Sequence, residues 1–185
     1  MPTRPKTSQP SKQTASQRPG RPSAHASAPD PIAMLREDHT KVKGLFDEFE
    51  AARTSRSKQR IAREALMELD VHAGIEEEIF YPAFNAESDA EETEEIVLEA
   101  EEEHHVVHVL ITELKEMMGS DDPRFDAKFT VLAENVRHHI KEEETQMLPK
   151  ARKLGKARLA ELGAQMMDRR QELQRQFKDE PAQTS

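Results

Sequence analysis

Apolar residues recur at spacings of three and four over most of this chain, which is the period of one face of an α-helix. The pattern marks four segments, whose first stripe residues are Ile32, Ile61, Val97 and Phe125. No segment alternates with the two-residue period of a half-buried strand. The sequence therefore predicts an all-α fold, and the short connections between long helices favour an up-down-up-down four-helix bundle.

Local signals predict where these helices begin and end. Asp30 followed by Pro31 is a strong start signal, because the first can cap the helix and the second suits its first turn. Gly119 to Pro123 predicts a break, and Pro149 is expected to end the fourth helix. Beyond the bundle, the amphipathic segment Leu154 to Phe177 predicts an additional C-terminal helix, packed outside the bundle or pairing with a second copy.

Composition divides the chain into three parts. Residues 1–29 contain five basic and no acidic residues and are rich in Pro, Ser, Thr and Gln. Such a segment buries too little apolar surface to fold, so it is expected to be a disordered tail that solubilises the chain or docks weakly to nucleic acid or an anionic surface. Residues 30–150 are the predicted bundle, and residues 151–185 are the extra helix and its tail.

The charge and cysteine content exclude several classes of protein. The whole chain carries a net charge of −9, and the part after the basic tail is more acidic still, which argues against nucleic-acid binding by the folded domain. The absence of cysteine excludes disulfides, thiolate metal sites and iron–sulfur clusters. No apolar run is long enough to cross a membrane and no secretion signal follows Met1, so we expect a cytoplasmic protein.

Polar residues interrupt the apolar stripes at matching places in all four segments. Two segments share the motif H-x-x-x-E with a proline six residues after the glutamate, and the other two read EDH and EEH. With about 1.5 Å of rise per residue, the histidines of the first, second and fourth helices lie about 12 to 15 Å from the same end of the bundle. The stripe residues concerned are His39, His72, Glu76, His104, His139 and Glu143.

These six residues predict a metal site. An ionised glutamate in a dry core costs several kcal/mol, and a bound cation removes that cost. Imidazole with carboxylate suits iron, manganese, zinc or copper. Six ligands are too many for one four-coordinate structural ion, whereas two ions bridged by the two carboxylates use them all. The alternative is a metal-free network of protonated carboxyl groups and neutral imidazoles.

Several neighbouring residues are further candidates for the site or its surroundings. His108 follows His104 by four residues, so its spacing predicts a seventh ligand, and the alternative is a histidine at the core boundary beside Val107. One residue off the stripe is about 100° around the helix, so two further histidines are expected either to support the ligands from outside or to face solvent. These are His105 and His138. Glu77 and Glu144 are expected to be acidic residues of the bundle surface, and the alternative is that they support the ligands from outside.

The motifs resemble those of the hemerythrin-like (HHE cation-binding) family over roughly residues 31–150. The resemblance implies a four-helix bundle holding a non-haem di-iron centre, in which the two glutamates, Glu76 and Glu143, are the bridging carboxylates. Its four histidine positions correspond to His39, His72, His104 and His139. The third helix resembles oxygen-carrying members through H-x-x-x-H, whereas the fourth has H-x-x-x-E, as in the wider family.

A ferritin-like centre is a different alternative. It needs E-x-x-H on two helices, and here only the third predicted helix has that motif.

Three functional classes follow from this resemblance. The first is a protein that binds O₂, nitric oxide or peroxide at two iron ions, in oxygen or iron handling or in sensing. The second is an enzyme that decomposes peroxide or consumes nitric oxide in stress defence. The third is a structural or regulatory module that a metal only stabilises. Manganese or zinc is expected less than iron, and the chain is expected to be a monomer or a homodimer formed through the C-terminal helix.

Overall fold

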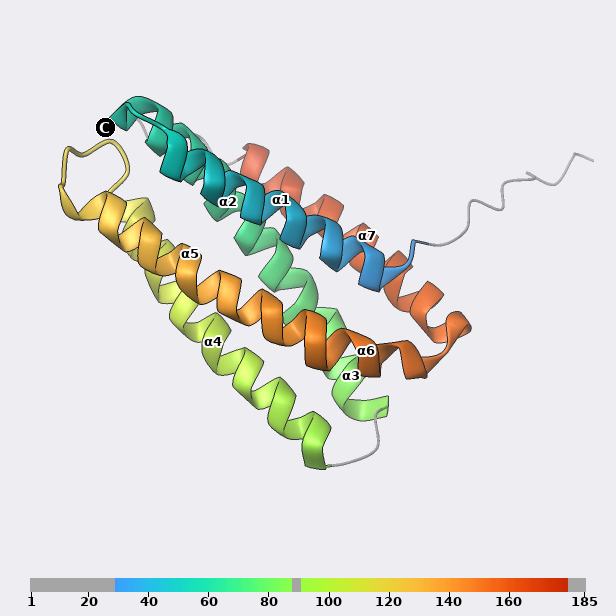
Figure 1. The fold of residues 1–185 in the computed structure, drawn as a ribbon. Helices are drawn as coiled ribbons and strands as arrows, with labels where there is room; N and C mark the ends of the chain where they lie inside the picture. The colour runs from blue at the N-terminus through green and yellow to red at the C-terminus, as the bar shows by residue number, and fades with distance from the viewer. Residues whose placement is uncertain (1–28, 88–90, 180–185) are drawn as a thin grey trace, which may run out of the picture.

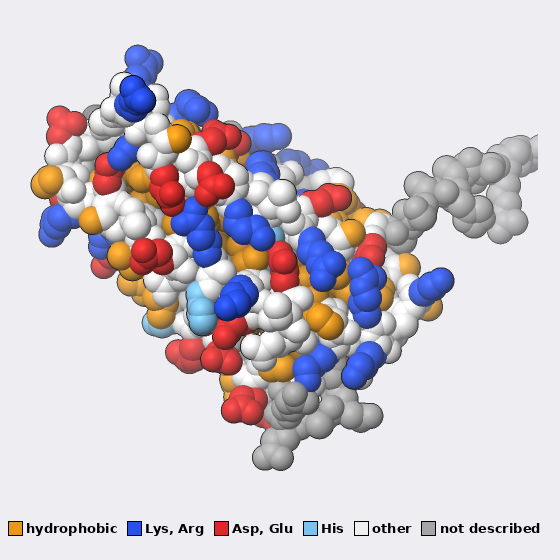
Figure 2. All heavy atoms as spheres, in the orientation of Figure 1, with side chains coloured by type: hydrophobic (Ala, Val, Ile, Leu, Met, Phe, Trp, Pro, Cys, Tyr) orange, Lys and Arg blue, Asp and Glu red, His pale blue; other side chains and the backbone are white. Residues whose placement is uncertain are grey.

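The computed structural model describes residues 29–87 and 91–179, and all of the secondary structure in these ranges is helical (Figure 1). The predicted all-α class is therefore confirmed. The predicted disordered tail lies outside the described residues except for Pro29. Charged side chains of both signs are mixed over the face shown in Figure 2, with apolar side chains visible between them. Within the described ranges, no helix combines the length and the apolar character needed to cross a membrane.

Four long helices pack around a shared interior. They are α1 (Pro31–Ala51), α2 (Ser55–Ile75), α4 (Glu91–Glu116) and α5 (Arg124–Glu142). Contacts join α1 to α2, α2 to α4, α4 to α5 and α5 to α1. As predicted, Asp30 caps α1: its Oδ1 accepts a hydrogen bond from the backbone N–H of Ile32 at 3.0 Å, which stabilises the helix by about 1 kcal/mol. The fifth long helix, α7 (Lys156–Asp179), lies along α1 and α2 (Figure 1).

The apolar interior consists of two clusters of buried residues, with the predicted histidine level between them. One cluster surrounds Phe46, Phe129 and Leu132, and the other surrounds Leu35, Phe80 and Leu148. Each fully buried large side chain stabilises the fold by about 1.5 to 3 kcal/mol. The polar level between them therefore has an apolar layer on each side of it.

Helices α2 and α5 each lead into a wide π-helical turn. These turns, Glu76–Phe80 and Glu143–Met147, lead into the short helices α3 (Tyr81–Glu87) and α6 (Leu148–Ala151), and a 3₁₀ turn (Arg152–Leu154) follows α6. The backbone N–H of Tyr81 donates to the carbonyl of Glu76, five residues back, and the corresponding bond joins Leu148 to Glu143.

The prediction that Pro149 ends the fourth helix is wrong. Helical backbone continues through it to Leu154. Proline lacks an N–H and clashes with the carbonyl of the preceding α-helical turn. Here Pro149 is the second residue of α6, directly after the wide turn, where its missing donor is not needed.

Candidate metal centre

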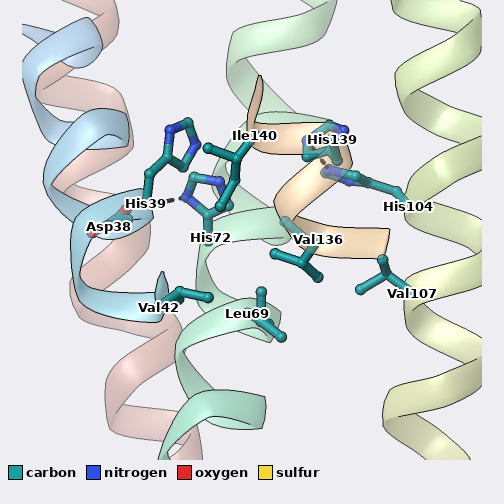
Figure 3. Close-up of a pocket in the computed structure, with 11 residues that line it drawn as sticks. Asp38, His39, Val42, Leu69, His72, His104, Val107, Val136, His139 and Ile140 are labelled. Atoms are coloured by element: carbon teal, nitrogen blue, oxygen red, sulfur yellow. Dashed lines mark hydrogen bonds and ion pairs between the residues drawn. The ribbon is translucent and has the colours of Figure 1, made fainter. Parts of the chain in front are cut away.

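The structure brings together the six residues predicted from the stripes, and all of them are buried. Their relative exposures range from 0% to 6%. His39 comes from α1, and His104 comes from α4. The two glutamates, Glu76 and Glu143, are the first residues of the two π-helical turns, a backbone form that is frequent at functional sites. Figure 3 shows the rings of His39 and His72 close together, with those of His104 and His139 beside them.

The six residues form two groups of donor atoms that share one carboxylate. The first group contains His39, His72, Glu76 and Glu143, and the second contains Glu76, His104 and His139; within each group the donor atoms lie within 4.8 Å of one another. Glu76 Oε2 lies 3.2 Å from His72 Nε2 and 3.5 Å from His104 Nε2. The geometry therefore provides two adjacent places for a cation, with Glu76 between them.

Several inward-facing atoms of this cluster lack hydrogen bonds within the described part of the chain. They are His39 Nε2, His72 Nε2, Glu76 Oε1 and both carboxylate oxygens of Glu143. His39 Nε2 does approach Glu143 Oε2 to 2.9 Å, but without hydrogen-bond geometry. Each buried polar atom left without a partner costs about 1 to 3 kcal/mol. A cation satisfies all of these atoms at once, so the residues fit a metal.

The protonation states of the buried groups also suit metal binding. Burial and the charge of Glu143 raise the pKa of Glu76 well above its ordinary value. Burial opposes ionisation of Glu143 too, but the adjacent His39 ring lowers the pKa of this carboxyl. Burial lowers the pKa of His72 to about 4, so its ring is neutral at pH 7 and can offer a lone pair. A cation between the carboxylates allows both to ionise.

The outer nitrogen of each of the four histidines, Nδ1, bonds to a carboxylate on a neighbouring helix or helical turn. The pairs are His39 with Glu144 (2.9 Å), His72 with Asp38 (3.2 Å), His104 with Glu77 (2.7 Å) and His139 with Glu103 (2.8 Å). Such bonds fix the ring tautomer and orientation, and they make the other nitrogen a better ligand. The four links join α1, α2, α4 and α5 in a closed ring, and they point Nε2 of every histidine inward.

Only part of this outer ring was predicted from the sequence. Glu77 and Glu144 were expected at the bundle surface, with support of the ligands as the alternative, and each bonds a buried histidine while keeping about a third of its side chain exposed. Asp38 and Glu103 were not predicted at all. The sequence does contain a pattern that marks them, because each directly precedes a predicted histidine ligand in EDH or EEH. A residue one position before the histidine lies about 100° around the helix from it, which directs its side chain toward the next helix.

His108 is not brought together with the six. Its side chain is 42% exposed, and its Nε2 lies 2.9 Å from Glu77 Oε1. Its ring centroid is 6.3 Å from that of His104. Glu77, His104 and His108 form a further group of donor atoms at the edge of the centre, so a ligand role for His108 stays a prediction.

Tyr81 was not among the predicted site residues, and its side chain lies inside the second group of donor atoms. Its hydroxyl oxygen is 3.2 Å from His104 Nε2, 3.5 Å from His139 Nε2 and 3.4 Å from Glu76 Oε2. Burial and the charge of Glu76 raise its pKa well above the ordinary value, so the phenol is neutral and donates a hydrogen bond to Glu76. This hydroxyl therefore lies within hydrogen-bonding distance of all three residues of the second group.

Two small cavities adjoin the centre. One, of about 20 Å³, has room for a single water-sized molecule, and four of its lining residues are the predicted histidines. Its other walls are largely apolar, and Figure 3 shows these side chains beside the rings: Val42, Leu69, Val107, Val136 and Ile140. The second cavity, of similar size, reaches His139 and Glu143 past the acidic residues Glu99, Glu103 and Glu142. The centre therefore has one apolar and one polar side.

The sequence profile of the hemerythrin HHE cation binding domain matches residues 30–151. The chain belongs to this hemerythrin family. The match spans α1, α2, α4 and α5 and every residue of the six-residue centre. It ends before α7, which begins at Lys156. Membership of the family and the His/Glu groups together make this a helical protein of the metal-binding HHE class.

Relatives of this hemerythrin-family chain are found among curated proteins. It is 30% identical over 143 residues to the uncharacterized protein Rv2633c of Mycobacterium tuberculosis and equally to the uncharacterized protein Mb2666c of Mycobacterium bovis. Both matches cover 76% of this chain and 84% of the relative. A protein named DNA nickase from Nostoc is 28% identical over 114 residues, which is 62% of this chain and 31% of that protein. No solved structure matches the chain.

Proposed function

We propose that this protein is a non-haem di-iron protein that binds O₂, nitric oxide or peroxide inside a hemerythrin-type up-down-up-down bundle formed by residues 30–150. One observation carries the proposal: two buried groups of His and Glu donors share Glu76, and several of their inward-facing atoms have no partner among the described residues. His39, His72 and Glu143 would hold one ion with Glu76. His104 and His139 would hold the other.

The composition of the donor set favours iron with reversible chemistry. Four imidazoles and two carboxylates suit iron, and also manganese or zinc. When bound, iron ions supply open coordination positions and electrons for small oxidants. Imidazole contributes less negative charge than carboxylate does, so a histidine-rich centre favours reversible binding over strong oxidation.

The chain's own residues protect whatever enters the centre. The apolar walls at Val42, Val107 and Val136 exclude water from the cavity beside the histidine rings. The cavity's size restricts the ligand to a molecule of a few atoms. The outer carboxylates hold the imidazoles in place while the ligand binds and leaves.

Tyr81 favours a second candidate, an enzyme that decomposes peroxide. Its neutral hydroxyl lies among the donor atoms and is placed to give a hydrogen bond to a peroxide molecule in the centre. Removing a positioned hydrogen-bond donor of this kind typically slows a reaction about 10²- to 10³-fold. Under this candidate, Tyr81→Phe slows peroxide consumption at least 10-fold while metal content stays unchanged, whereas an unchanged rate would exclude a role for the phenol.

The experiment that separates the functions uses the full chain loaded anaerobically with Fe²⁺. We expect two ions per chain and an optical band that appears with O₂ and disappears when O₂ is removed. Rapid, repeated loss of added peroxide would favour the enzyme over the binding protein. An iron-loaded protein that responds to none of O₂, peroxide and nitric oxide would instead favour a structural or regulatory module that the metal only stabilises.

A further inference from the structure

Helix α7 lies beyond the part of the chain matched by the family profile, yet one of its side chains reaches the ring of carboxylates around the centre. Arg170 Nη1 donates to Asp38 Oδ1 at 2.9 Å, and its Nη2 donates to Asp38 Oδ2. Asp38 Oδ2 in turn accepts a hydrogen bond from His72 Nδ1 at 3.2 Å. Arg170 and Asp38 are largely buried, with side-chain exposures of 17% and 12%. A chain of direct contacts therefore runs from α7 to a predicted metal ligand.

Close packing on both sides of Arg170 fixes the position of α7. At Gly163, an added Cβ would lie 1.8 Å from the backbone oxygen of Pro29, so the helix approaches the start of α1 as closely as glycine allows. Leu173 packs against Gly74 of α2, where an added Cβ would lie 2.8 Å from the leucine side chain. Arg170 is thus presented to Asp38 by a docked helix.

Asp38 also differs from the other three outer carboxylates in the partner it has. Lys43 lies 3.5 Å from Glu144, His108 lies 2.9 Å from Glu77, and His138 lies 3.6 Å from Glu103. Among the four outer carboxylates, all in the described part of the chain, Asp38 alone accepts hydrogen bonds from two nitrogens of one arginine. A two-pronged guanidinium contact fixes the plane of a carboxylate, which a single ammonium or imidazole does not.

We propose that α7 is a working part of the metal centre and that Arg170 is a positioning residue, which holds Asp38 and thereby the ring of His72 toward the ion in the His39, His72, Glu76 and Glu143 group. This inference rests on the proposed two-metal function. Arg170 acts through Asp38 and His72, and it contacts neither the ion nor its ligand. Its effect is therefore specific to one of the two metal positions.

The test is an anaerobic titration of the full chain with Fe²⁺, comparing Arg170→Gln with Arg169→Gln. Arg169 is a matched control because it makes a similar two-nitrogen contact, but with the exposed Glu78, which bonds no predicted ligand. Loss of an outer partner of a metal-bound histidine typically weakens metal binding about 10- to 100-fold. In Arg170→Gln we therefore expect the affinity for one of the two ions to fall about 10- to 100-fold. In Arg169→Gln we expect the affinity for either ion to change less than about twofold.

Mössbauer spectra of the protein loaded with iron-57 supply a readout that general stability does not move. Arg170→Gln should alter the signal of one iron and leave the other as in the wild type, and Arg170→Lys should be intermediate because it keeps the charge without the fork. Should Arg170→Gln fail to fold, Asp38→Asn is expected to give the same one-iron change.

Two results would overturn the inference. One is that Arg170→Gln binds both ions with wild-type affinity. The other is that Arg170→Gln and Arg169→Gln both bind the two ions more weakly, and to the same extent. Each requires that the wild type itself binds two ions. A wild type that binds fewer contradicts the proposed function instead, so the two failures are distinguishable.

Discussion

Replacement of Glu76 by glutamine separates a metal centre from ordinary core packing. The substitution keeps the size and shape of a side chain that is completely buried, and it removes the carboxylate shared by the two donor groups. We therefore expect two opposite effects. The metal-free variant should be more stable than the wild type, and it should bind metal less well.

The magnitude of the first effect follows from the pKa of Glu76. Burial and the charge of Glu143 raise this pKa well above the ordinary 4.5. A raised folded-state pKa means that the stability from this group is complete below pH 4.5 and is lost as the pH rises toward the folded-state pKa. Because one pH unit corresponds to about 1.4 kcal/mol, the loss at pH 7 reaches at most about 3 kcal/mol. Glutamine takes up no proton and avoids this loss.

The second effect comes from linkage between binding and folding. An ion at 100 times its dissociation constant stabilises the folded state by about 2.7 kcal/mol. The wild type should gain this from both ions, whereas Glu76→Gln lacks the shared ligand. The order of stability should therefore reverse when metal is added, because each kcal/mol moves the unfolding midpoint by about 2 to 4 °C in a domain of this size.

Thermal unfolding followed by circular dichroism measures both effects, with chelator and with anaerobic Fe²⁺, at pH 4.5 and pH 7. Without metal at pH 7, Glu76→Gln should unfold up to about 6 to 12 °C above the wild type, and the difference should vanish at pH 4.5. Glu101→Gln, an exposed change on α4, is the matched control. A metal-free Glu76→Gln variant that melts at or below the wild type at pH 7, or one that binds two ions with wild-type affinity, refutes the reasoning.

Two further predictions concern glycine packing and His108, the candidate seventh ligand. Gly163→Ala places a Cβ against Pro29, so it should lower the free energy of unfolding by about 1 to 3 kcal/mol in denaturant titrations. Gly44→Ala has open space around it and should raise that free energy by about 0.5 to 1 kcal/mol. Equal effects of the two substitutions would contradict the close approach of α7 to Pro29. His108→Ala should keep both ions in metal analysis, because His108 is 42% exposed and bonds Glu77; loss of one ion would make it a ligand.

The sequence predicted the helical class and the inward-facing residues because both depend on local periodicity. The stripe of α1 illustrates this: Ile32, Leu35, Val42 and Phe46 are all buried, and His39 is buried among them. A histidine that follows the same spacing as these apolar residues must face the same interior. The inward position of the six polar residues could be predicted in the same way.

The remaining features depend on contacts that no local pattern contains. Arg170 and Asp38 are 132 residues apart in the chain, and only the docking of α7 brings them together. Tyr81 reaches the centre because a π-helical turn from Glu76 to Phe80 rotates it relative to an ordinary helix. The identity of each outer carboxylate likewise depends on how neighbouring helices are rotated, which the acidic doublets suggest but do not determine.

The most direct test of the central claim is the number of metal ions bound by the full chain. After anaerobic loading with Fe²⁺ and removal of loosely bound ions, the proposed centre predicts two irons per chain, and less than one when His39 and His104 are both replaced by alanine. A folded wild-type chain that retains less than one ion would contradict a dinuclear centre built on Glu76.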